Sequence, residues 1–266
     1  MLYKDALKIA FEDIKKGWER RHLWLLLAWD DIRLRYKRSV LGPMWITLGT
    51  GFFIVVLSAL WTELMAKKAS IFVPWFSIGI ITWQFISSIV TESSTILLGV
   101  SGIIQNIAMP LSIHIYRSVM RHLLNYVHNF IIVIIVLIIF PPPLTAKIIL
   151  FFPGILIIAV TAFATSIIFG ILGARFRDFS YTVSMLMGPI FFITPIIWMP
   201  DMLSGTRSVM AQLNPFAHFL AIVREPLLGH APTLINYIVT MSISGILVLI
   251  SLLFLGKHKS KVAYWV

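Results

Sequence analysis

The stretch IILFFPGILIIAVTAFATSIIFGILG, residues 148–173, decides the fold class because it carries no charged side chain. A helix needs about 20 apolar residues to cross the hydrocarbon core of a bilayer, so this run is long enough to span. Backbone inside hydrocarbon must satisfy its own hydrogen bonds, and a long unbroken run is not the short alternating segment of a barrel. The stretch therefore predicts a transmembrane helix.

Similar runs fill most of the chain. Across 266 residues, 59% are apolar and only 12% are charged, about half the charge of a soluble domain. We expect an all-α membrane protein with six transmembrane helices in one domain, residues 42–266. The predicted spans are 42–64, 72–98, 123–140, 148–173, 182–199 and 233–255.

Residues 1–41 have a different pattern. Leu7, Phe11, Ile14 and Trp18 recur every three or four residues, which predicts one apolar helical face. The next apolar run, residues 23–29, is too short to span. This stretch is predicted to be a cytoplasmic amphipathic interface region. Its acids, mixed among bases without an early apolar core, are not typical of a cleavable signal peptide.

The net charge of +11 reflects topology rather than nucleic-acid binding. With the N-terminus inside, 17 of the 22 Lys and Arg residues fall in cytoplasmic segments. This positive-inside bias predicts a multi-pass protein with both termini in the cytoplasm. A nucleic-acid groove would instead need a basic stripe on a water-soluble fold.

Motifs for catalysis are missing from the sequence. There is no phosphate-binding loop of the form G-x-x-x-x-G-K-[ST], no H-E-x-x-H and no G-x-S-x-G. There are also no cysteines. We therefore expect no bound cofactor, no metal site and no ATPase activity in this chain, so that ATP would have to act through another chain.

Several side chains within the runs are candidates for function. Glu92 lies close to the end of its span, where contact with polar neighbours at the headgroups is favoured over a proton or substrate site. Four aromatic residues lie deeper in the predicted spans than the aromatics near the span ends. They could face lipid or line a path for sugars. These channel candidates are Phe52, Trp83, Phe191 and Phe192.

Small residues and helix breakers mark two further regions. Ala162, Ser166, Gly170 and Ala174 form a stripe that allows close helix packing, within one subunit or between two. The external stretch 200–232 contains two pieces, 208–213 and 217–228, that are expected to be short helices dipping back toward the membrane.

Several motifs, in order along the chain, resemble one transporter family. They are DDIRLRYKRSVLGPMW (30–45), PLS (110–112), ARFRD (174–178), TPIIW (194–198), LNPF (213–216) and REPLLG (224–229). Together they resemble the membrane subunit of type-2 ABC polysaccharide exporters, most closely the O-antigen branch.

The resemblance implies a homodimer in the bacterial inner membrane, joined to two cytoplasmic ABC ATPase subunits that bind ATP and magnesium. The implied substrate is a polysaccharide linked to polyprenyl pyrophosphate, which moves to the periplasm through a channel between the two copies. Alternatives are export of another lipid-linked glycan such as capsule or teichoic acid, or of a drug. Different classes are an intramembrane glycan-modifying enzyme and a scaffold without transport.

The resemblance also implies roles for residues at matching positions. The segment before Gly42 would be the interface helix, and Gln105, Asn106, Met109, Pro110 and Leu111 would couple to the ATPase. The external gate would include Asn214, Pro215, Phe216, Arg224, Glu225 and Pro226. Arg33, Arg35, Lys37 and Arg38 would sit near the substrate pyrophosphate, or they could serve only as topology determinants.

Overall fold

The computed structural model describes residues 3–35, 37, 39, 41–42, 44–64, 67–143, 145–202 and 206–266. These described residues form helices and connecting segments, without a strand. The α-helices are α1 (Tyr3–Glu19), α2 (Arg21–Arg35), α3 (Met44–Leu64), α4 (Ala69–Ser93), α5 (Ser101–Asn106), α6 (Ser112–Ile139), α7 (Phe151–Arg175), α8 (Asp178–Ile193), α9 (Thr206–Leu213), α10 (Pro215–Leu227) and α11 (Leu234–Trp265). Short 3₁₀ turns are η1 (Leu98–Val100), η2 (Ala146–Leu150) and η3 (Pro200–Met202).

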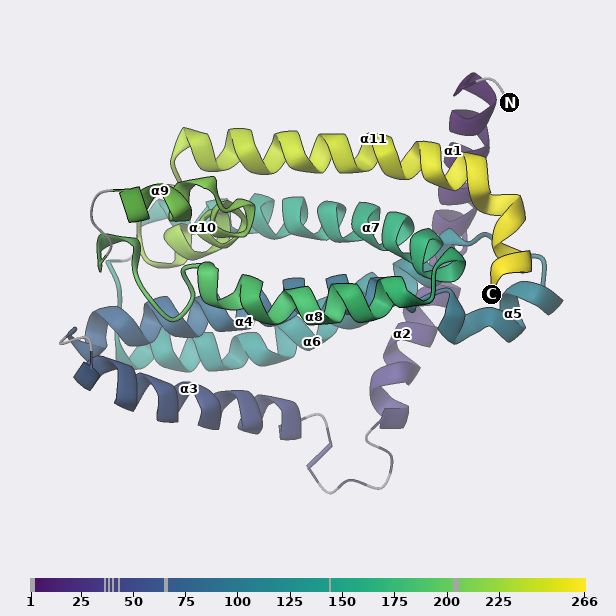
Figure 1. The fold of residues 1–266 in the computed structure, drawn as a ribbon. Helices are drawn as coiled ribbons and strands as arrows, with labels where there is room; N and C mark the ends of the chain where they lie inside the picture. The colour runs from purple at the N-terminus through teal and green to yellow at the C-terminus, as the bar shows by residue number, and fades with distance from the viewer. Residues whose placement is uncertain are drawn as a thin grey trace.

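The long helices α3, α4, α6, α7, α8 and α11 lie roughly side by side (Figure 1). Helices α1 and α2 run across one end of this bundle, at a steep angle to its axis, and the C-terminus lies at the same end (Figure 1). We call this the terminal end. The opposite end, which carries α9 and α10, is called the loop end. The predicted interface region thus forms two helices that cross the bundle at one end.

Five helical segments are long and apolar enough to cross a membrane. They are α3, α4, α6, η2 with α7, and α11. Their bounds differ from the predicted runs mainly at the terminal end, because α6 begins at Ser112 and α11 continues to Trp265. The predicted span 182–199 corresponds to α8, an apolar helix of 16 residues that falls short of the spanning length.

Helix α8 is short because proline ends it. Thr194 precedes Pro195 and has an extended backbone, φ −88° and ψ 136°. A residue before proline is driven from the helical region because the proline ring clashes with its backbone. The remaining residues of the predicted span, up to Met199, form irregular chain.

Helix α3 has the reverse of the pattern of a soluble helix. Its buried residues are Thr47, Thr50, Ile54 and Ser58, three of them polar and all on one face. The side chains on its exposed face include Leu48, Phe52, Val55 and Val56. The Thr47 hydroxyl donates to Asn129 Oδ1 at 3.2 Å, and the Thr50 hydroxyl donates to Gln84 Oε1 at 3.4 Å. Such a helix is stable where the surrounding solvent is apolar and small polar residues join helices.

Helix α11 follows the same rule. Thr240, Ser244 and Ser251 are buried, and Ile238, Met241 and Leu249 are exposed. It packs along α7. Because both peripheral helices present apolar side chains outward, the fold matches the expectation of a protein that has lipid as its solvent.

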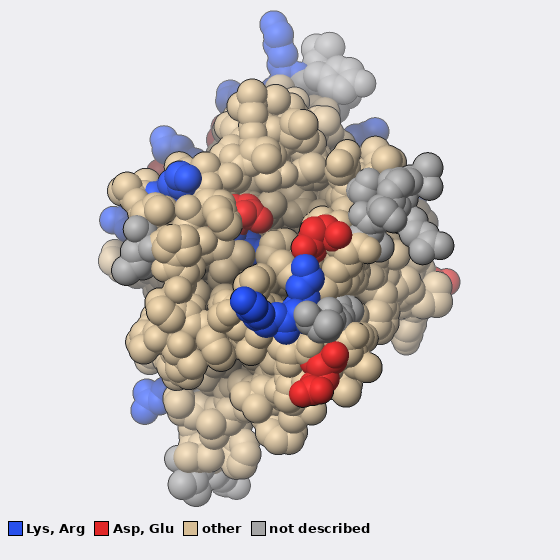
Figure 2. Space-filling model, turned by 90° about the vertical axis from the view of Figure 1, so that its left-hand side faces the viewer, with Lys and Arg blue, Asp and Glu red and all other residues tan. Residues whose placement is uncertain are grey.

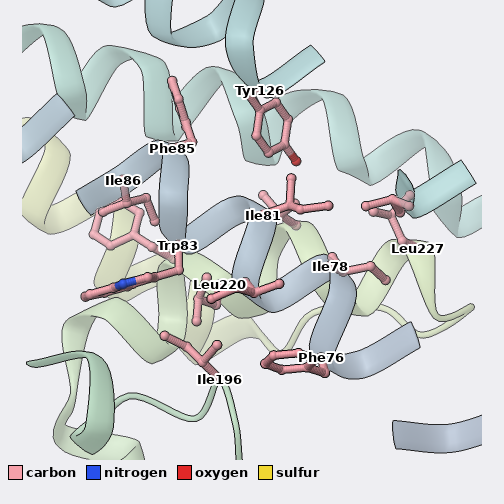
Figure 3. Close-up of a cluster of buried hydrophobic side chains, with 14 of the residues drawn as sticks. Phe76, Ile78, Ile81, Trp83, Phe85, Ile86, Tyr126, Ile196, Leu220 and Leu227 are labelled. Atoms are coloured by element: carbon pink, nitrogen blue, oxygen red, sulfur yellow. The ribbon is translucent and has the colours of Figure 1, made fainter. Parts of the chain in front are cut away.

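Helix α4 supplies most of the side chains labelled in the buried cluster of Figure 3. It contacts α3, α6, α7, α8 and α10, and most of its apolar side chains are buried, as expected of a helix with neighbours on most sides. Phe72 and Phe76 stack at 5.7 Å between ring centroids, and Phe85 contacts Tyr126 of α6 at 5.3 Å. Ile196 and Leu220 close this core from the segment after α8 and from α10.

The small-residue stripe of α7 packs within the chain. Ala162, Ser166, Gly170 and Ala174 are all buried. Ser166 and Ser93 hydroxyls lie 2.8 Å apart, which joins α7 to the end of α4. A Cβ atom at Gly173, in the next turn, would overlap the Ser94 carbonyl oxygen. The stripe therefore brings α7 close to α4. Of the two alternatives, packing within one subunit or between two, the stripe serves packing within one subunit.

Helix α1 docks through only part of the predicted apolar face, because Leu7 and Ile14 pack against the core while smaller residues are buried beside them. Its buried residues are Ala6, Ala10, Asp13 and Gly17, whereas Phe11 and Trp18 of the predicted apolar face are more than half exposed. Small residues win this contact because α1 lies so near to α11 that a Cβ at Gly256 would overlap the Ala6 carbonyl oxygen. Phe11 is thereby left exposed, while Trp18, although half exposed, contacts the rings of Trp24 and Tyr116, each at 5.8 Å between centroids.

Replacing Gly173 with leucine should destabilise the protein by about 2–3 kcal/mol or more, because α4 and α7 must separate to admit the side chain. The matched control is Gly245→Leu on α11, where a new Cβ meets no described atom within 4 Å. Thermal unfolding in detergent measures both variants. Equal unfolding midpoints for the two would contradict the close packing at Gly173.

Candidate functional site

An open groove runs between α4 and α8 and is the main candidate site. Its volume is about 680 Å³. Aromatic residues line one part, hydroxyl groups line the middle, and charged groups line the part toward the terminal end. The lining residues are Arg35, Trp83, Ser87, Ser88, Thr91, Glu92, Thr95, His122, Ser184, Met187, Gly188, Phe191 and Phe192.

The structure brings three of the four channel candidates together in this groove. The Trp83 and Phe191 rings lie 6.0 Å apart, and Phe191 contacts Phe192 edge to face at 5.2 Å. Trp83 also contacts Phe216 of α10 at 5.5 Å. Trp83 is buried, whereas Phe192 is 64% exposed, so the aromatic wall extends from the protein core to the open side.

Phe52 lies apart from the other three. It projects from α3 with 72% of its surface exposed, and it does not line the groove. Most of helix α8 is also exposed, since only Val183 and Met187 of its residues are buried. The exposed apolar faces of α3 and α8 therefore border a groove that this chain leaves open.

A cluster of charged groups closes the groove toward the terminal end. Asp31 of α2 accepts from Arg117 Nε at 2.8 Å and from Arg121 Nη1 at 3.3 Å. Glu92 of α4 accepts from Arg121 and lies 3.0 Å from His122 Nε2. The expected polar surroundings of Glu92 are confirmed. The pairing of Asp31 with these arginines was not predicted from the sequence. The available signal was that Arg117 and Arg121 lie one turn apart on a helix and so share a face, where one acid can bind both.

The four basic headgroup candidates separate in space. Arg35 lines the groove. Arg33 and Lys37 line another cavity, of about 760 Å³, at the end of α2 beside Trp29 and Gly42. Arg38 lies outside the described residues. Of the described candidates, Arg35 is therefore the one that lies with the aromatic residues and Glu92.

The coupling candidates form an exposed tip with a buried base. Gln105 and Asn106 are exposed at the end of α5, whereas Pro110 and Leu111 are buried at the start of α6. The neighbouring Ile107 is an apolar residue with 53% of its surface exposed. Gln105 also donates to the carbonyl oxygen of Val266 at 2.6 Å.

Asp13 of α1 holds the base of this tip. Its fully buried carboxylate accepts from the Leu111 and Ser112 backbone N–H groups at 3.2 Å and 2.9 Å. Unpaired N–H groups at a helix start favour an acid, which here comes from another helix. Lys259 of α11 lies 2.8 Å from the same carboxylate. One side chain thus ties α1, α6 and α11 together.

The external gate candidates fall on and around α10 at the loop end. Asn214 caps α10 by accepting from the Phe216 N–H at 2.9 Å, and its side-chain amide donates to Thr194 Oγ1 at 3.0 Å. Pro215 occupies the first helical turn, where a missing N–H costs nothing. Pro226 is buried in the last turn, and Glu225 lies 3.4 Å from His230.

Arg224 anchors α10 in the bundle although it is only 2% exposed. Its guanidinium donates to the Pro195 carbonyl at 2.8 Å and lies over the Trp75 ring at 3.8 Å. A Cβ at Gly79 would overlap this guanidinium, so glycine makes room for it. Burial lowers the pKa of Arg224 to about 9, and the group is still charged at neutral pH.

Few charges appear on the loop end. In Figure 2, which faces this end, Lys, Arg, Asp and Glu gather near the middle of a mostly uncharged surface. Lys67 and Asp201 form an ion pair there at 2.6 Å. Helix α10 is largely buried beneath this surface, while α9 contacts only α10 and η3 among the closer helix pairs. The two short external helices thus differ in how firmly they are held.

No group of three or more His, Cys, Asp or Glu side chains suited to a metal ion occurs within the described ranges. The site instead offers aromatic faces, hydroxyl groups and a cluster of paired charges. This combination is suited to binding and guiding a molecule.

Residues 22–228 match the ABC-2 type transporter family, so the chain belongs to that family. The match begins in α2 and ends just after α10, and it therefore includes the groove, the coupling candidates and the gate candidates. Membership makes the protein a permease, the multi-pass membrane subunit of a transporter, and implies an ABC ATPase as partner.

The chain is also similar to curated permeases. An O-antigen export system permease protein RfbA of Klebsiella pneumoniae is 27% identical over 248 residues, 91% of this chain and 93% of the relative. A second such protein of Klebsiella pneumoniae is 25% identical over 76% of this chain and 79% of its own length. The Myxococcus xanthus RfbA permease is 23% identical over 78% of this chain and 80% of its own length.

Replacing Asp13 with alanine should lower the free energy of unfolding by on the order of 3 kcal/mol, because the α6 N–H groups lose their acceptor and Lys259 loses its partner. Asp5→Ala on the exposed face of α1 is the matched control. Thermal unfolding in detergent measures the difference. An unfolding midpoint for Asp13→Ala as high as that of the control would show that Asp13 does not hold these helices.

Proposed function

We propose that this chain is the membrane subunit of an ATP-driven exporter that moves polysaccharide linked to polyprenyl pyrophosphate, of the O-antigen kind, from cytoplasm to periplasm. The observation that carries the proposal is the groove, because it combines an aromatic wall with hydroxyl groups and a charged end. The names of the similar permeases support O-antigen as the substrate class.

The chemistry of the groove suits a moving sugar chain. A neutral glycan needs many weak contacts, because one tight contact would stop its movement. The faces of Trp83, Phe191 and Phe192 can stack on sugar C–H groups at roughly 1 kcal/mol each. Ser87, Ser88 and Ser184 add hydroxyl groups that exchange hydrogen bonds easily. Arg35 at the charged end would attract the pyrophosphate of the carrier.

A second copy would complete the channel. The groove is open on one side, and the apolar faces of α3 and α8 that border it are exposed. In a homodimer these faces would pack on the partner, and the two grooves would enclose one passage. Phe52 would then lie near the subunit boundary, which is how a residue outside this groove could still reach the channel.

The topology that we propose has six spans and both termini in the cytoplasm, with residues 1–41 as the interface region and 42–266 as the transmembrane domain. The uneven distribution of Lys and Arg supports this direction. Helix α8 would be the short fifth span. Helices α9 and α10 would be re-entrant on the periplasmic side, in the inner membrane of a bacterium. Anchored by Arg224, α10 would be the fixed part of the external gate and α9 the movable part.

Two ATPase subunits would drive transport from the cytoplasmic side, where they bind ATP and magnesium. The exposed tip at Gln105, Asn106 and Ile107 would seat in the ATPase, and Met109 would lie at its edge. Buried Pro110 and Leu111 would transmit the push into α6. Since Asp13 joins α6 to α1 and α11, ATPase closure would move these three helices together.

Deleting the gene tests the function directly. We expect surface polysaccharide to disappear and lipid-linked polysaccharide to accumulate inside the cell, with both reversed by the wild-type gene. Normal surface polysaccharide in the deletion strain would refute export of this substrate. Accumulation of a shortened or unmodified glycan on the surface would instead indicate a glycan-modifying enzyme.

Phe191→Ala combined with Phe192→Ala should reduce export roughly thirtyfold, because two contacts of roughly 1 kcal/mol each are lost along the path. The matched control is Phe152→Ala on α7, an equally exposed phenylalanine away from the groove. Export is measured as surface polysaccharide per unit of protein in the complemented strain. A loss in the control as large as in the double variant would contradict a role for the groove aromatics.

Ile107→Asp should abolish co-purification with the ATPase while leaving the protein folded, since this side chain is exposed at the tip and its neighbours stay in place. Leu213→Asp at the opposite end of the bundle, at the last residue of α9, is the control for an exposed apolar residue outside the predicted spans. Retention of the ATPase by the Ile107 variant would place the coupling contact elsewhere.

A further inference from the structure

A second cavity adjoins the groove at its charged end. Its volume is about 240 Å³, and we call it the arginine pocket. It shares Glu92 and Thr95 with the groove, so the two spaces meet at these residues. Its lining residues are Glu92, Thr95, Ile96, Gly99, Val100, His114, Arg117, Ser118 and Arg121.

Two guanidinium groups in this pocket are held by carboxylate oxygens. Arg117 and Arg121 lie one helical turn apart on α6, and Asp31 bridges them. Arg121 also pairs with Glu92, whose Oε1 accepts from the Ser118 hydroxyl at 2.8 Å. Guanidinium groups bind phosphate oxygens in the same planar geometry as carboxylate oxygens. The carboxylates thus occupy positions that phosphoryl oxygens could take.

The two acids differ in how firmly they are held. The Asp31 side chain is 14% exposed and is bound by both arginines, whereas the Glu92 side chain is 30% exposed. Glu92 has other partners besides Arg121, because His122 Nε2 lies 3.0 Å from its Oε2 and Ser118 donates to its Oε1. If Arg121 turned away, Glu92 would stay hydrogen-bonded. Glu92 is therefore the acid that an incoming anion can replace.

His114 gives a second sign that the pocket accepts a ligand. It lines the pocket and is only 3% exposed, and neither ring nitrogen has a hydrogen-bond partner among the described residues. Buried polar side chains are normally hydrogen-bonded, and one left unsatisfied costs about 1–3 kcal/mol. An anion in the pocket would supply an acceptor near this ring.

We propose that the arginine pocket binds the phosphoryl oxygens of a pyrophosphate group, with Arg121 exchanging Glu92 for the anion. This assignment rests on the proposed function, in which the carrier of the glycan has a pyrophosphate. The two arginines and two carboxylates sum to zero formal charge, so these four side chains balance one another. A pyrophosphate carries more charge than the single carboxylate that it displaces and has oxygens for both arginines.

The position of the pocket fits this role. Thr95 and Glu92 separate it from the groove, whose hydroxyl and aromatic residues continue along α4 from Thr91 to Trp83. A pyrophosphate held by Arg117 and Arg121 would therefore leave its attached sugars pointing into the groove. Arg35, which lines the groove near Glu92, would face the same anion from the side of α2.

Binding of inorganic pyrophosphate to the purified full-length chain in nanodiscs of neutral lipid tests the proposal, with calorimetry as the readout. Glu92→Gln should bind about tenfold more tightly than wild type, because the competing charge is gone while the amide still accepts from Ser118. Arg121→Gln should bind at least tenfold more weakly. Arg121→Lys keeps the charge but loses the paired N–H donors of the guanidinium, so its affinity for pyrophosphate should lie between those of wild type and Arg121→Gln.

The matched control is Arg177→Gln, an exposed arginine at the start of α8 that lines neither cavity. Its affinity should equal that of wild type. Unchanged or weaker binding by Glu92→Gln would overturn the exchange, since a purely structural ion pair predicts no gain. Equal losses in Arg121→Gln and Arg177→Gln would show that pyrophosphate binds by general attraction and would also overturn the assignment.

Two further probes identify the source of the phosphate. Inorganic phosphate should bind at least tenfold more weakly than pyrophosphate, because it carries less negative charge and offers fewer oxygens to the two arginines. Adding phosphatidylglycerol to the nanodiscs should leave pyrophosphate affinity unchanged, whereas competition would assign the pocket to a lipid headgroup instead. None of these measurements uses export. The binding test can therefore refute the arginine pocket while the gene deletion supports export, and the gene deletion can refute export while the binding test supports the pocket.

Discussion

Lipid as the solvent is the constraint on which the rest of this structure depends. Helices α3 and α11 turn Thr and Ser inward and Ile, Leu, Val and Phe outward, an arrangement that water would destabilise through exposed apolar area. Inside the bundle, the same small polar residues let helices approach and hydrogen-bond. The groove follows from this arrangement, because polar residues of α4 and Ser184 of α8 line a path that continues beside the aromatic residues.

The two ends of the bundle are held by single charged side chains. At the terminal end, the carboxylate of Asp13 joins α1, α6 and α11. At the loop end, the guanidinium of Arg224 joins α10 to Trp75 and Pro195. Charges buried in this way are costly unless they are bonded, so each fixes the geometry of its surroundings. The groove lies between these two fixed points, and α9 lies outside them.

The sequence predicted much of the fold but less of the site. Hydrophobic runs gave the helical class and the long helices, because length and apolarity decide spanning. The predicted fifth span continued to Met199, whereas α8 ends at Ile193, because Pro195 forces Thr194 into an extended conformation. The docking face of α1 was predicted in part: Leu7 and Ile14 pack against the core, whereas close approach at Gly256 favours Ala6 and Ala10 over Phe11 and Trp18. Asp31 and Arg117, and Arg224 and Trp75, are distant in sequence, and only tertiary packing brings each pair together.

Cysteine labelling tests directly whether lipid covers the outer helix faces while water reaches the groove. The chain has no cysteine of its own, so each introduced thiol is labelled alone. A membrane-impermeant maleimide would be applied to the single-cysteine variants Ser184→Cys, in the groove, and Leu249→Cys, on the outer face of α11. We expect fast labelling at position 184 in membranes open on the cytoplasmic side, and none at position 249. Labelling of position 249 together with protection of position 184 would mean that water and lipid are on the opposite faces, and would contradict the account.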